Sequence, residues 1–197
     1  MTHELHQAGL APDQMLARLT SFIDQIVTFS QRIGLDLTAY QMDHIALRIN
    51  DEKLAQQAHQ AWLAYGDEIS CAQINGRPII VLAFNPVLDA GCWKIDCLEL
   101  PYPALGKAYP TQDWEHVECV IPSNAQTAQE YLDDLLARFP LFATQFAQFE
   151  SLGVKVKLSS PKGEGERLAN PTVALKWQGI TIKLHPHSLK AVIESER

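Results

Sequence analysis

The sequence predicts an α+β fold in which two βαβββ modules form a curved, cup-like mixed sheet, with an extra helix at the N-terminus. Three observations carry this prediction. First, residues 43–49 read DHIALRI and residues 115–121 read EHVECVI, and each run joins an acidic residue and a histidine to an alternating strand pattern. Second, a helix-like segment follows each run. Third, three more strand-like segments follow each helix.

The N-terminal region, residues 1–39, is predicted to hold a loose tail over 1–11 and then an amphipathic helix that ends near Gly34. Pro12 is tolerated in a first turn, and Asp13 suits the positive end of a helix. Because this helix lies outside the repeat, we expect it to cover an exposed face of the main domain or a partner subunit. The apolar residues at helical spacing are Met15, Leu16, Leu19, Phe22, Ile23, Ile26, Val27 and Phe29.

The first module, residues 40–110, opens with a strand whose side chains alternate between two faces. Asn50 and Asp51 favour the start of a helix, and Asn75-Gly76 is a hairpin signal. One face of the opening strand carries Ile45, Leu47 and Ile49, and the other carries His44, Ala46 and Arg48. The other predicted elements are a helix over 52–65 and strands over 68–75, 78–85 and 92–100.

The second module, residues 111–197, repeats this order with a helical insertion, and the two modules are expected to form one domain. Pro140 breaks its first helix, and Gly179 permits a tight turn between its last two strands. The charged loop over 161–168 is expected to be a solvated surface or, alternatively, a lid. The predicted elements are a strand from Trp114, helices over 125–139 and 141–152, and strands over 154–159, 171–178 and 180–185.

Composition and motifs exclude several classes of function. The 16 basic and 23 acidic residues give a net charge of −7, without the basic cluster that nucleic acid requires. There is no secretory signal and no long apolar stretch, so a cytoplasmic location without membrane contact is expected. Nucleotide-binding glycine motifs and a serine-hydrolase elbow are absent. The four cysteines, without a Cys-x-x-Cys pair, are interpreted as buried thiols. A small-molecule substrate is the expected partner, and the oligomeric state stays open.

The matched histidines, His44 and His116, would meet at one metal ion if the modules pack symmetrically. The βαβββ repeat with a histidine in each first strand resembles the vicinal oxygen chelate superfamily, which includes glyoxalase I and extradiol dioxygenases, over roughly residues 40–186. More narrowly, the whole chain resembles the YecM family of small bacterial proteins. The superfamily resemblance implies a divalent metal bound by first-strand His or Glu residues and by acidic residues of each module's last strand.

On this chain, the resemblance implies His44, Glu99 and His116 as metal ligands. Matching LELPYP to IKLHPH puts Lys183 opposite Glu99, and residues 172–190 contain no Asp or Glu. A protonated lysine cannot bind a cation, so His185, two residues further on, is the candidate fourth ligand. A His, His, Glu set with open positions suits Fe(II) or Mn(II), and Zn(II) is also considered.

Two main hypotheses of function follow. The first is a metal-dependent enzyme, isomerase- or dioxygenase-like, that acts on a small oxygen-rich substrate. In it, Arg48, Glu118 and Lys183 contact substrate or transfer protons. Arg48 and Glu118 are alternatively expected to pair as a structural salt bridge. The second hypothesis is a metal-free protein that binds a small anion, with the Lys183 ammonium in place of the metal charge. A third hypothesis is an interaction module that docks a partner through the N-terminal helix.

Overall fold

The computed structural model describes residues 3–74, 76–160 and 168–195, and it divides the chain into two compact units. Unit 1 comprises Met1–Ile23 and His44–Glu115, and unit 2 comprises Asp24–Asp43 and His116–Arg197. Three elements contribute residues to both units: helix α2 (Pro12–Arg32) and strands β1 (Gln41–Leu47) and β5 (Trp114–Val120). Each unit contains a βαβββ module, as expected. The boundaries 1–39, 40–110 and 111–197 stay a prediction.

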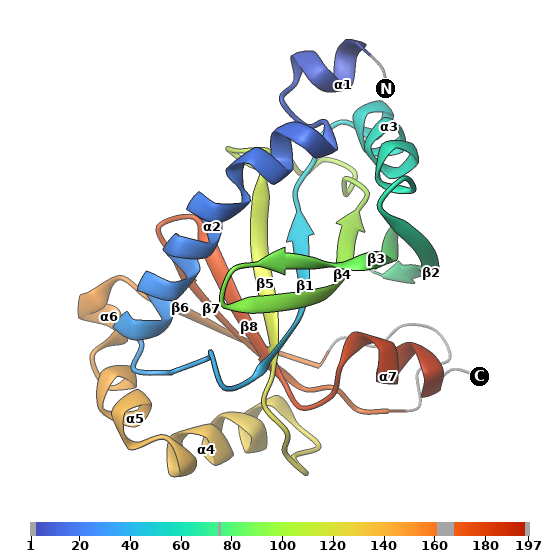
Figure 1. Cartoon of the computed structure of the whole chain (residues 1–197). Coiled ribbons are helices and arrows are strands. Elements are labelled where there is room, and N and C mark those ends of the chain that lie inside the picture. The colour runs from blue at the N-terminus through green and yellow to red at the C-terminus, as the bar shows by residue number, and fades with distance from the viewer. Residues whose placement is uncertain (1–2, 75, 161–167, 196–197) are drawn as a thin grey trace. The chain divides into compact units, whose positions relative to one another are not determined.

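Unit 1 is built on four strands in the order β2-β3-β4-β1 (Figure 1). Strands β1 and β4 are parallel, and the other two neighbouring pairs are antiparallel. Parallel pairing of the first and last strands sets Ala46 beside Glu99 and His44 beside Cys97. The other elements of this unit are α1 (His3–Gln7), α3 (Glu52–Trp62), β2 (Gly66–Ile74), β3 (Arg77–Ala90) and β4 (Trp93–Pro101).

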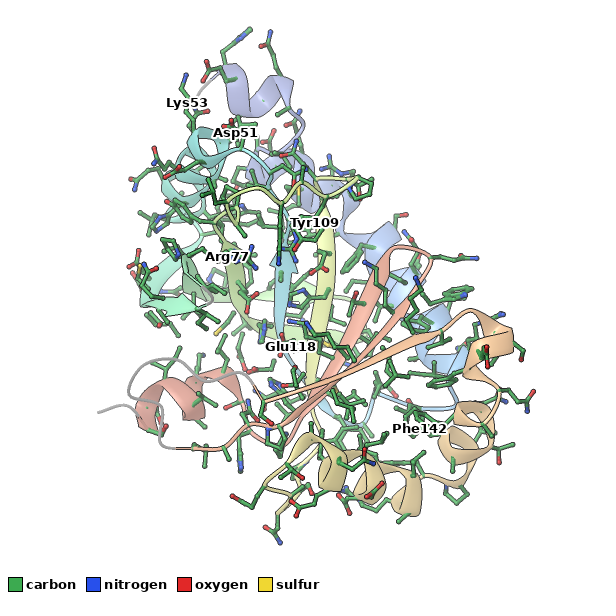
Figure 2. The ribbon with its side chains drawn as sticks, turned by 180° about the vertical axis from the view of Figure 1, so that it is seen from behind. Asp51, Lys53, Arg77, Tyr109, Glu118 and Phe142 are labelled. Atoms are coloured by element: carbon green, nitrogen blue, oxygen red, sulfur yellow. The ribbon has the colours of Figure 1, made fainter. Side chains whose placement is uncertain are left out.

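Helix α3 begins where its capping residue predicts. The Asp51 side chain accepts a hydrogen bond from the Leu54 backbone N–H at 2.8 Å. Lys53 in the first turn pairs with Glu4 of α1 at 2.8 Å, at the end of α3 where Figure 2 labels Asp51 and Lys53. The predicted loose tail is therefore wrong, because residues 3–7 form α1 and bury Leu5 against the unit. A short segment with one apolar anchor shows too little periodicity to reveal this from sequence.

Unit 2 repeats the arrangement with strand order β5-β8-β7-β6, and here β5 and β8 are the parallel pair. The tight turn at Gly179 is confirmed, with φ +89 at Gly179 and φ +48 at Gln178. Phe142 of α5, labelled in Figure 2, lies near the rings of Phe146 and Phe149. The ring centroids are 5.9 Å apart in both pairs. Its other elements are α4 (Ala128–Arg138), α5 (Pro140–Phe146), α6 (Phe149–Leu152), β6 (Lys155–Ser159), β7 (Thr172–Trp177), β8 (Ile180–His185) and α7 (Leu189–Ser195).

Two elements differ from the sequence prediction. Strand β3 continues through Pro86 to Ala90, and its pairing with β4 is irregular between Ala83 and Leu88. Proline inside a strand argues against continuation, and the irregularity is what accommodates it. Helix α7 was not predicted, although Ser188 Oγ accepts from the Ala191 N–H at 3.2 Å and Val192 and Ile193 are buried. Asn75 of the predicted hairpin turn and residues 161–167 of the predicted charged loop lie outside the described residues.

The helices of the described chain include none with the length and hydropathy needed to cross a membrane. The amphipathic helix predicted after Pro12 is confirmed as α2, whose residues up to Ile23 belong to unit 1 and whose later residues belong to unit 2. Trp114 Nε1 donates to the Met15 carbonyl at 2.9 Å in unit 1. In unit 2, Phe29 stacks on Trp177 with ring centroids 5.6 Å apart.

The cysteines fall into two classes, and this corrects the prediction that all are buried. Cys71 and Cys92 are exposed, because Cys71 lies on β2, at the end of unit 1's strand order, and Cys92 lies in the turn after β3. Cys97 and Cys119 are buried, and burial raises the pKa of the Cys119 thiol to about 12. Because the thiolate is the reactive form, Ellman's reagent is expected to modify two thiols rapidly in native protein and all four in denaturant. A third rapid equivalent in native protein would contradict this assignment.

Candidate functional site

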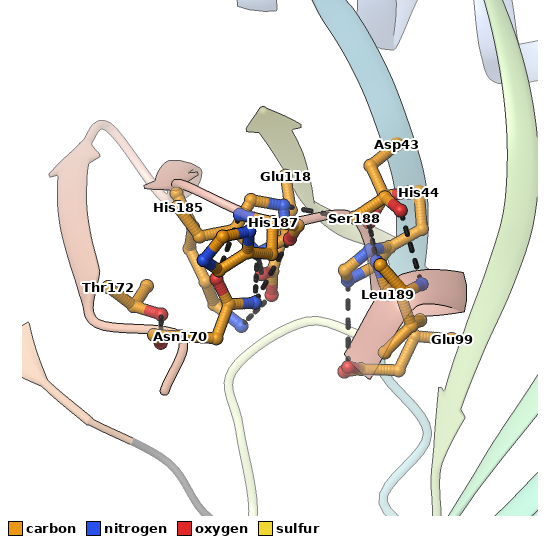
Figure 3. A network of polar contacts seen from close by, with 12 residues as sticks. Asp43, His44, Glu99, Glu118, Asn170, Thr172, His185, His187, Ser188 and Leu189 are labelled. Atoms are coloured by element: carbon orange, nitrogen blue, oxygen red, sulfur yellow. Dashed lines mark hydrogen bonds and ion pairs between the residues drawn. The ribbon is translucent and has the colours of Figure 1, made fainter. Parts of the chain in front are cut away.

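The first half-site consists of His44 on β1 and Glu99 on β4, both in unit 1. Because Ala46 is the register partner of Glu99, the carboxylate lies diagonally across the strand pair from His44 on the same face. His44 Nε2 and Glu99 Oε2 are 3.7 Å apart, as the dashed line in Figure 3 marks. The histidine is 1% exposed and the Glu99 side chain 15%. The sequence-predicted pair is thus brought together in a largely dry environment.

The second half-site consists of His116 and Glu118 on β5 together with Lys183 on β8, all in unit 2. His116 Nε2 and Glu118 Oε1 are 3.2 Å apart. The Lys183 ammonium donates to Glu118 Oε1 at 2.6 Å and lies 3.0 Å from His116 Nε2. Since an ammonium has only donors, the contact requires a lone pair on His116 Nε2, which places the proton of a neutral ring on Nδ1. In this half-site the Lys183 ammonium therefore contacts both His116 and Glu118.

The two half-sites have the same strand register. The last strand carries an acid, Glu99, in the first half-site and a base, Lys183, in the second. Glu99 pairs with the residue two positions after His44, and Lys183 pairs with the residue two positions after His116. This register agrees with the alignment of Lys183 with Glu99. The carboxylate missing from the last strand of the second module is instead supplied by Glu118 on the first strand, where the first module has Ala46. The difference is visible in the sequence, because the third residue of each histidine-led run (HIA and HVE) is Ala46 in the first module and Glu118 in the second. On the sequence alone, Glu118 is a predicted catalytic residue and is not among the predicted metal ligands.

A second polar cluster surrounds His185 in unit 2. Its Nδ1 lies 3.1 Å from Asn170 Nδ2 and 3.4 Å from Glu118 Oε2. Its Nε2 lies 3.5 Å from Oδ2 of the fully buried Asp43, which accepts the Leu189 backbone N–H at 2.7 Å (Figure 3). Because Asn170 Nδ2 is a donor, it favours the tautomer that carries its proton on Nε2, towards Asp43. Sequence reasoning did not single out Asp43 or Asn170, although Asp43 is the first letter of the repeated motif.

Arg48 pairs with a different acid from the one expected. Its Nη2 lies 3.2 Å from Glu115 Oε2 in unit 1, whereas Glu118 pairs with Lys183. The Arg48 guanidinium carbon lies 4.1 Å from the centroid of the Tyr109 ring. Arg48 is therefore held by an acid and an aromatic face, both close to the end of β1.

Comparison with known proteins identifies the family. The sequence model of the YecM protein family matches residues 11–196. The chain belongs to the YecM family. The YecM protein of Escherichia coli (strain K12) is 36% identical over 179 residues, which span 91% of this chain and 90% of that protein. The family resemblance seen in the sequence is thereby confirmed.

Solved structures extend the YecM comparison. A chain described as a structural genomics protein matches with a TM-score of 0.78 at 30% identity, covering 96% of this chain and 93% of its own. Methylmalonyl-CoA epimerase from Mycobacterium tuberculosis matches with a TM-score of 0.42 at 15% identity, covering 82% of this chain and 98% of its own. This YecM-family chain has the repeated βαβββ order that the resemblance to the vicinal oxygen chelate superfamily implied.

Proposed function

We propose that this protein is a divalent-metal-dependent enzyme of the vicinal oxygen chelate type that acts on a small oxygen-rich substrate. The observation that carries the proposal is the matched construction of the half-sites. Each sets a buried first-strand histidine against a carboxylate, at 3.7 Å in the first and 3.2 Å in the second. The proposed ligands are His44 and Glu99 of the first module and His116 and Glu118 of the second.

The donor atoms fit such an ion. Two nitrogen or oxygen ligands bound at about 2.1 Å, with ordinary coordination angles, lie roughly 3.0–3.4 Å apart. The pair of His116 and Glu118 falls within this range, and the pair of His44 and Glu99 needs a shift of a few tenths of an ångström. A mixed imidazole and carboxylate set suits Fe(II), Mn(II) or Zn(II). The side chains present are therefore chemically suited to the metal that the family fold implies.

The bound ion would act as a Lewis acid on neighbouring substrate oxygens. The chain's own residues supply the remaining functions. Lys183, which contacts Glu118 and His116 in the metal-free protein, would donate a hydrogen bond to a substrate oxygen. His185 holds its proton on Nε2, because Asn170 occupies Nδ1, and Asp43 orients the ring. We therefore assign His185 to proton transfer, in preference to its alternative role as a fourth ligand.

Metal content tests the proposal directly. Untagged protein, purified without chelator or nickel resin, is expected to contain about one equivalent of Fe, Mn or Zn by elemental mass spectrometry. The His44→Ala/His116→Ala double variant is expected to lose it, while circular dichroism shows an intact fold. Protein that stays metal-free after addition of Fe(II), Mn(II) and Zn(II) would overturn the proposal.

The position of Lys183 favours one alternative function, a metal-free protein that binds a small anion. An ammonium in contact with His116 and Glu118 already provides a positive charge where the second half-site would otherwise bind an ion. This alternative predicts that small anions bind equally well before and after chelator treatment. It also predicts that Lys183→Met abolishes their binding.

A further inference from the structure

We infer that the guanidinium of Arg48 binds a carboxylate, so that the ligand class of this protein is a small monocarboxylic acid with additional oxygens. The inference rests on the proposed function only where it identifies that acid as the substrate. Binding of the carboxylate itself requires no metal, and it depends on residues of unit 1 alone.

The guanidinium is held in a defined plane. Its Nη2 faces Glu115 Oε2 at 3.2 Å, and its carbon lies 4.1 Å from the centroid of the Tyr109 ring. The Arg48 backbone N–H donates to the Asp113 carbonyl at 2.8 Å, and only 10% of the side chain is exposed. An arginine stacked on an aromatic ring and paired on one side has little remaining freedom, and preorganisation of this kind favours binding.

The Tyr109 ring is itself fixed by the chain near the end of β1. Asn50 Nδ2 donates to the Tyr109 carbonyl at 2.7 Å, and the Tyr109 N–H donates to Asn50 Oδ1 at 2.9 Å. The Asn50 N–H donates to Gln112 Oε1 at 2.7 Å. Tyr109 lies in the segment that follows β4, where Figure 2 labels it. Three hydrogen bonds that involve Asn50 therefore hold this segment in place, with the Tyr109 ring against the Arg48 guanidinium.

Two further donors of this fixed cation meet no acceptor in the described part of the chain. Among the described residues, Arg48 Nε and Nη1 have no hydrogen-bond partner, although both are buried. Buried polar groups are nearly always hydrogen-bonded, so two unpaired N–H donors on one cation require an explanation. Carboxylates and phosphates are the acceptors that guanidinium groups bind with charge-assisted hydrogen bonds. Glu115 already offsets the arginine charge, so a monoanion is less costly to bury there than a dianion.

Arg48 directly follows β1, which ends at Leu47. Positions 44 and 48 are four residues apart, so at about 3.3 Å per residue of extended chain they are separated by roughly 13 Å. The long arginine side chain shortens this span. An acid bound through its carboxylate at Arg48 would hold its other oxygens near the end of β1, in the unit that also contains His44 and Glu99.

The test follows the Arg48 Nε–H signal by NMR in metal-free protein. Lactate and pyruvate are expected to shift it saturably, whereas their uncharged analogues propane-1,2-diol and hydroxyacetone leave it unchanged. Inorganic phosphate is expected to bind more weakly. The variants at position 48 lack this signal, so their lactate binding is measured by isothermal titration calorimetry, and Arg48→Met is expected to weaken it about 10- to 100-fold, the loss typical of a charge-assisted contact. Glu115→Gln is expected to tighten it. Arg77→Met, at the β2–β3 hairpin of the same unit, is the matched control.

The outcomes separate this inference from the proposed function. Saturable carboxylate binding in a protein that never binds metal would leave Arg48 as a carboxylate site and would remove the metal-dependent enzyme. An Arg48 signal that does not move with either acid would overturn the carboxylate site and leave the metal proposal to its own test. Phosphate binding tighter than lactate would overturn the monocarboxylate assignment. If Arg48→Met does not fold, Arg48→Lys, which keeps the charge but loses the planar fork, is expected to bind lactate more weakly.

Discussion

His44→Ala is expected to weaken Mn(II) binding by on the order of 100-fold or more. Removing a residue that merely orients a metal ligand typically costs 10- to 100-fold in affinity, and loss of the ligand itself costs at least as much. His44 is buried beside Glu99, so bulk solvent has little access to supply a replacement ligand. Isothermal titration calorimetry of the metal-free protein measures the change.

A second histidine–glutamate pair in unit 1 provides the matched control. His59 on α3 lies 2.7 Å from Glu68 on β2, closer than His44 lies to Glu99. His59→Ala therefore removes the same chemical group from the same unit, and it is expected to leave Mn(II) affinity unchanged. Equal losses in the two variants would show that the effect of His44→Ala is one of general stability. Unchanged affinity in both would remove His44 from the ligand set.

Lys183→Met is expected to destabilise the metal-free protein by about 2–3 kcal/mol and to increase the stabilisation that Mn(II) provides. The change leaves the Glu118 carboxylate, 9% exposed, without the ammonium that contacts it at 2.6 Å. Breaking a fully buried ion pair costs about 3–5 kcal/mol, and we expect less here because the Lys183 side chain is 26% exposed. Urea unfolding with and without Mn(II) measures both effects.

The second effect arises because the divalent ion and the Lys183 ammonium compete for the same ligands. In the wild-type protein a divalent ion must displace the ammonium from His116 and Glu118, whereas in the variant it compensates an otherwise unpaired carboxylate. Lys94→Met is the control, because its exposed pair with Asp89 at the β3–β4 turn involves neither half-site. If Lys183→Met shows no response to Mn(II) and loses anion binding, the metal-free alternative is the better description of this protein.

Sequence patterns predicted the elements that are long and strongly periodic. Helix α2 follows the apolar spacing after Pro12, and both first strands follow the alternation around His44 and His116. Short or interrupted elements were missed. Helix α1 has a single buried anchor in five residues, and β3 runs through a proline that local rules treat as a strand end. In both places tertiary packing outweighs local preference.

The sequence by itself determined the two-module order, the family and the position of one histidine at the start of each module, because these depend on residues close together along the chain. Only the tertiary structure decided how the charges pair. Lys183 pairs with Glu118, which lies 65 positions earlier in the chain. His185, at the end of β8, lies beside Asp43 of β1. Such partners are set by strand register, and register depends on the packing of a whole sheet, so a local pattern identifies the charged residues without identifying which one neutralises which.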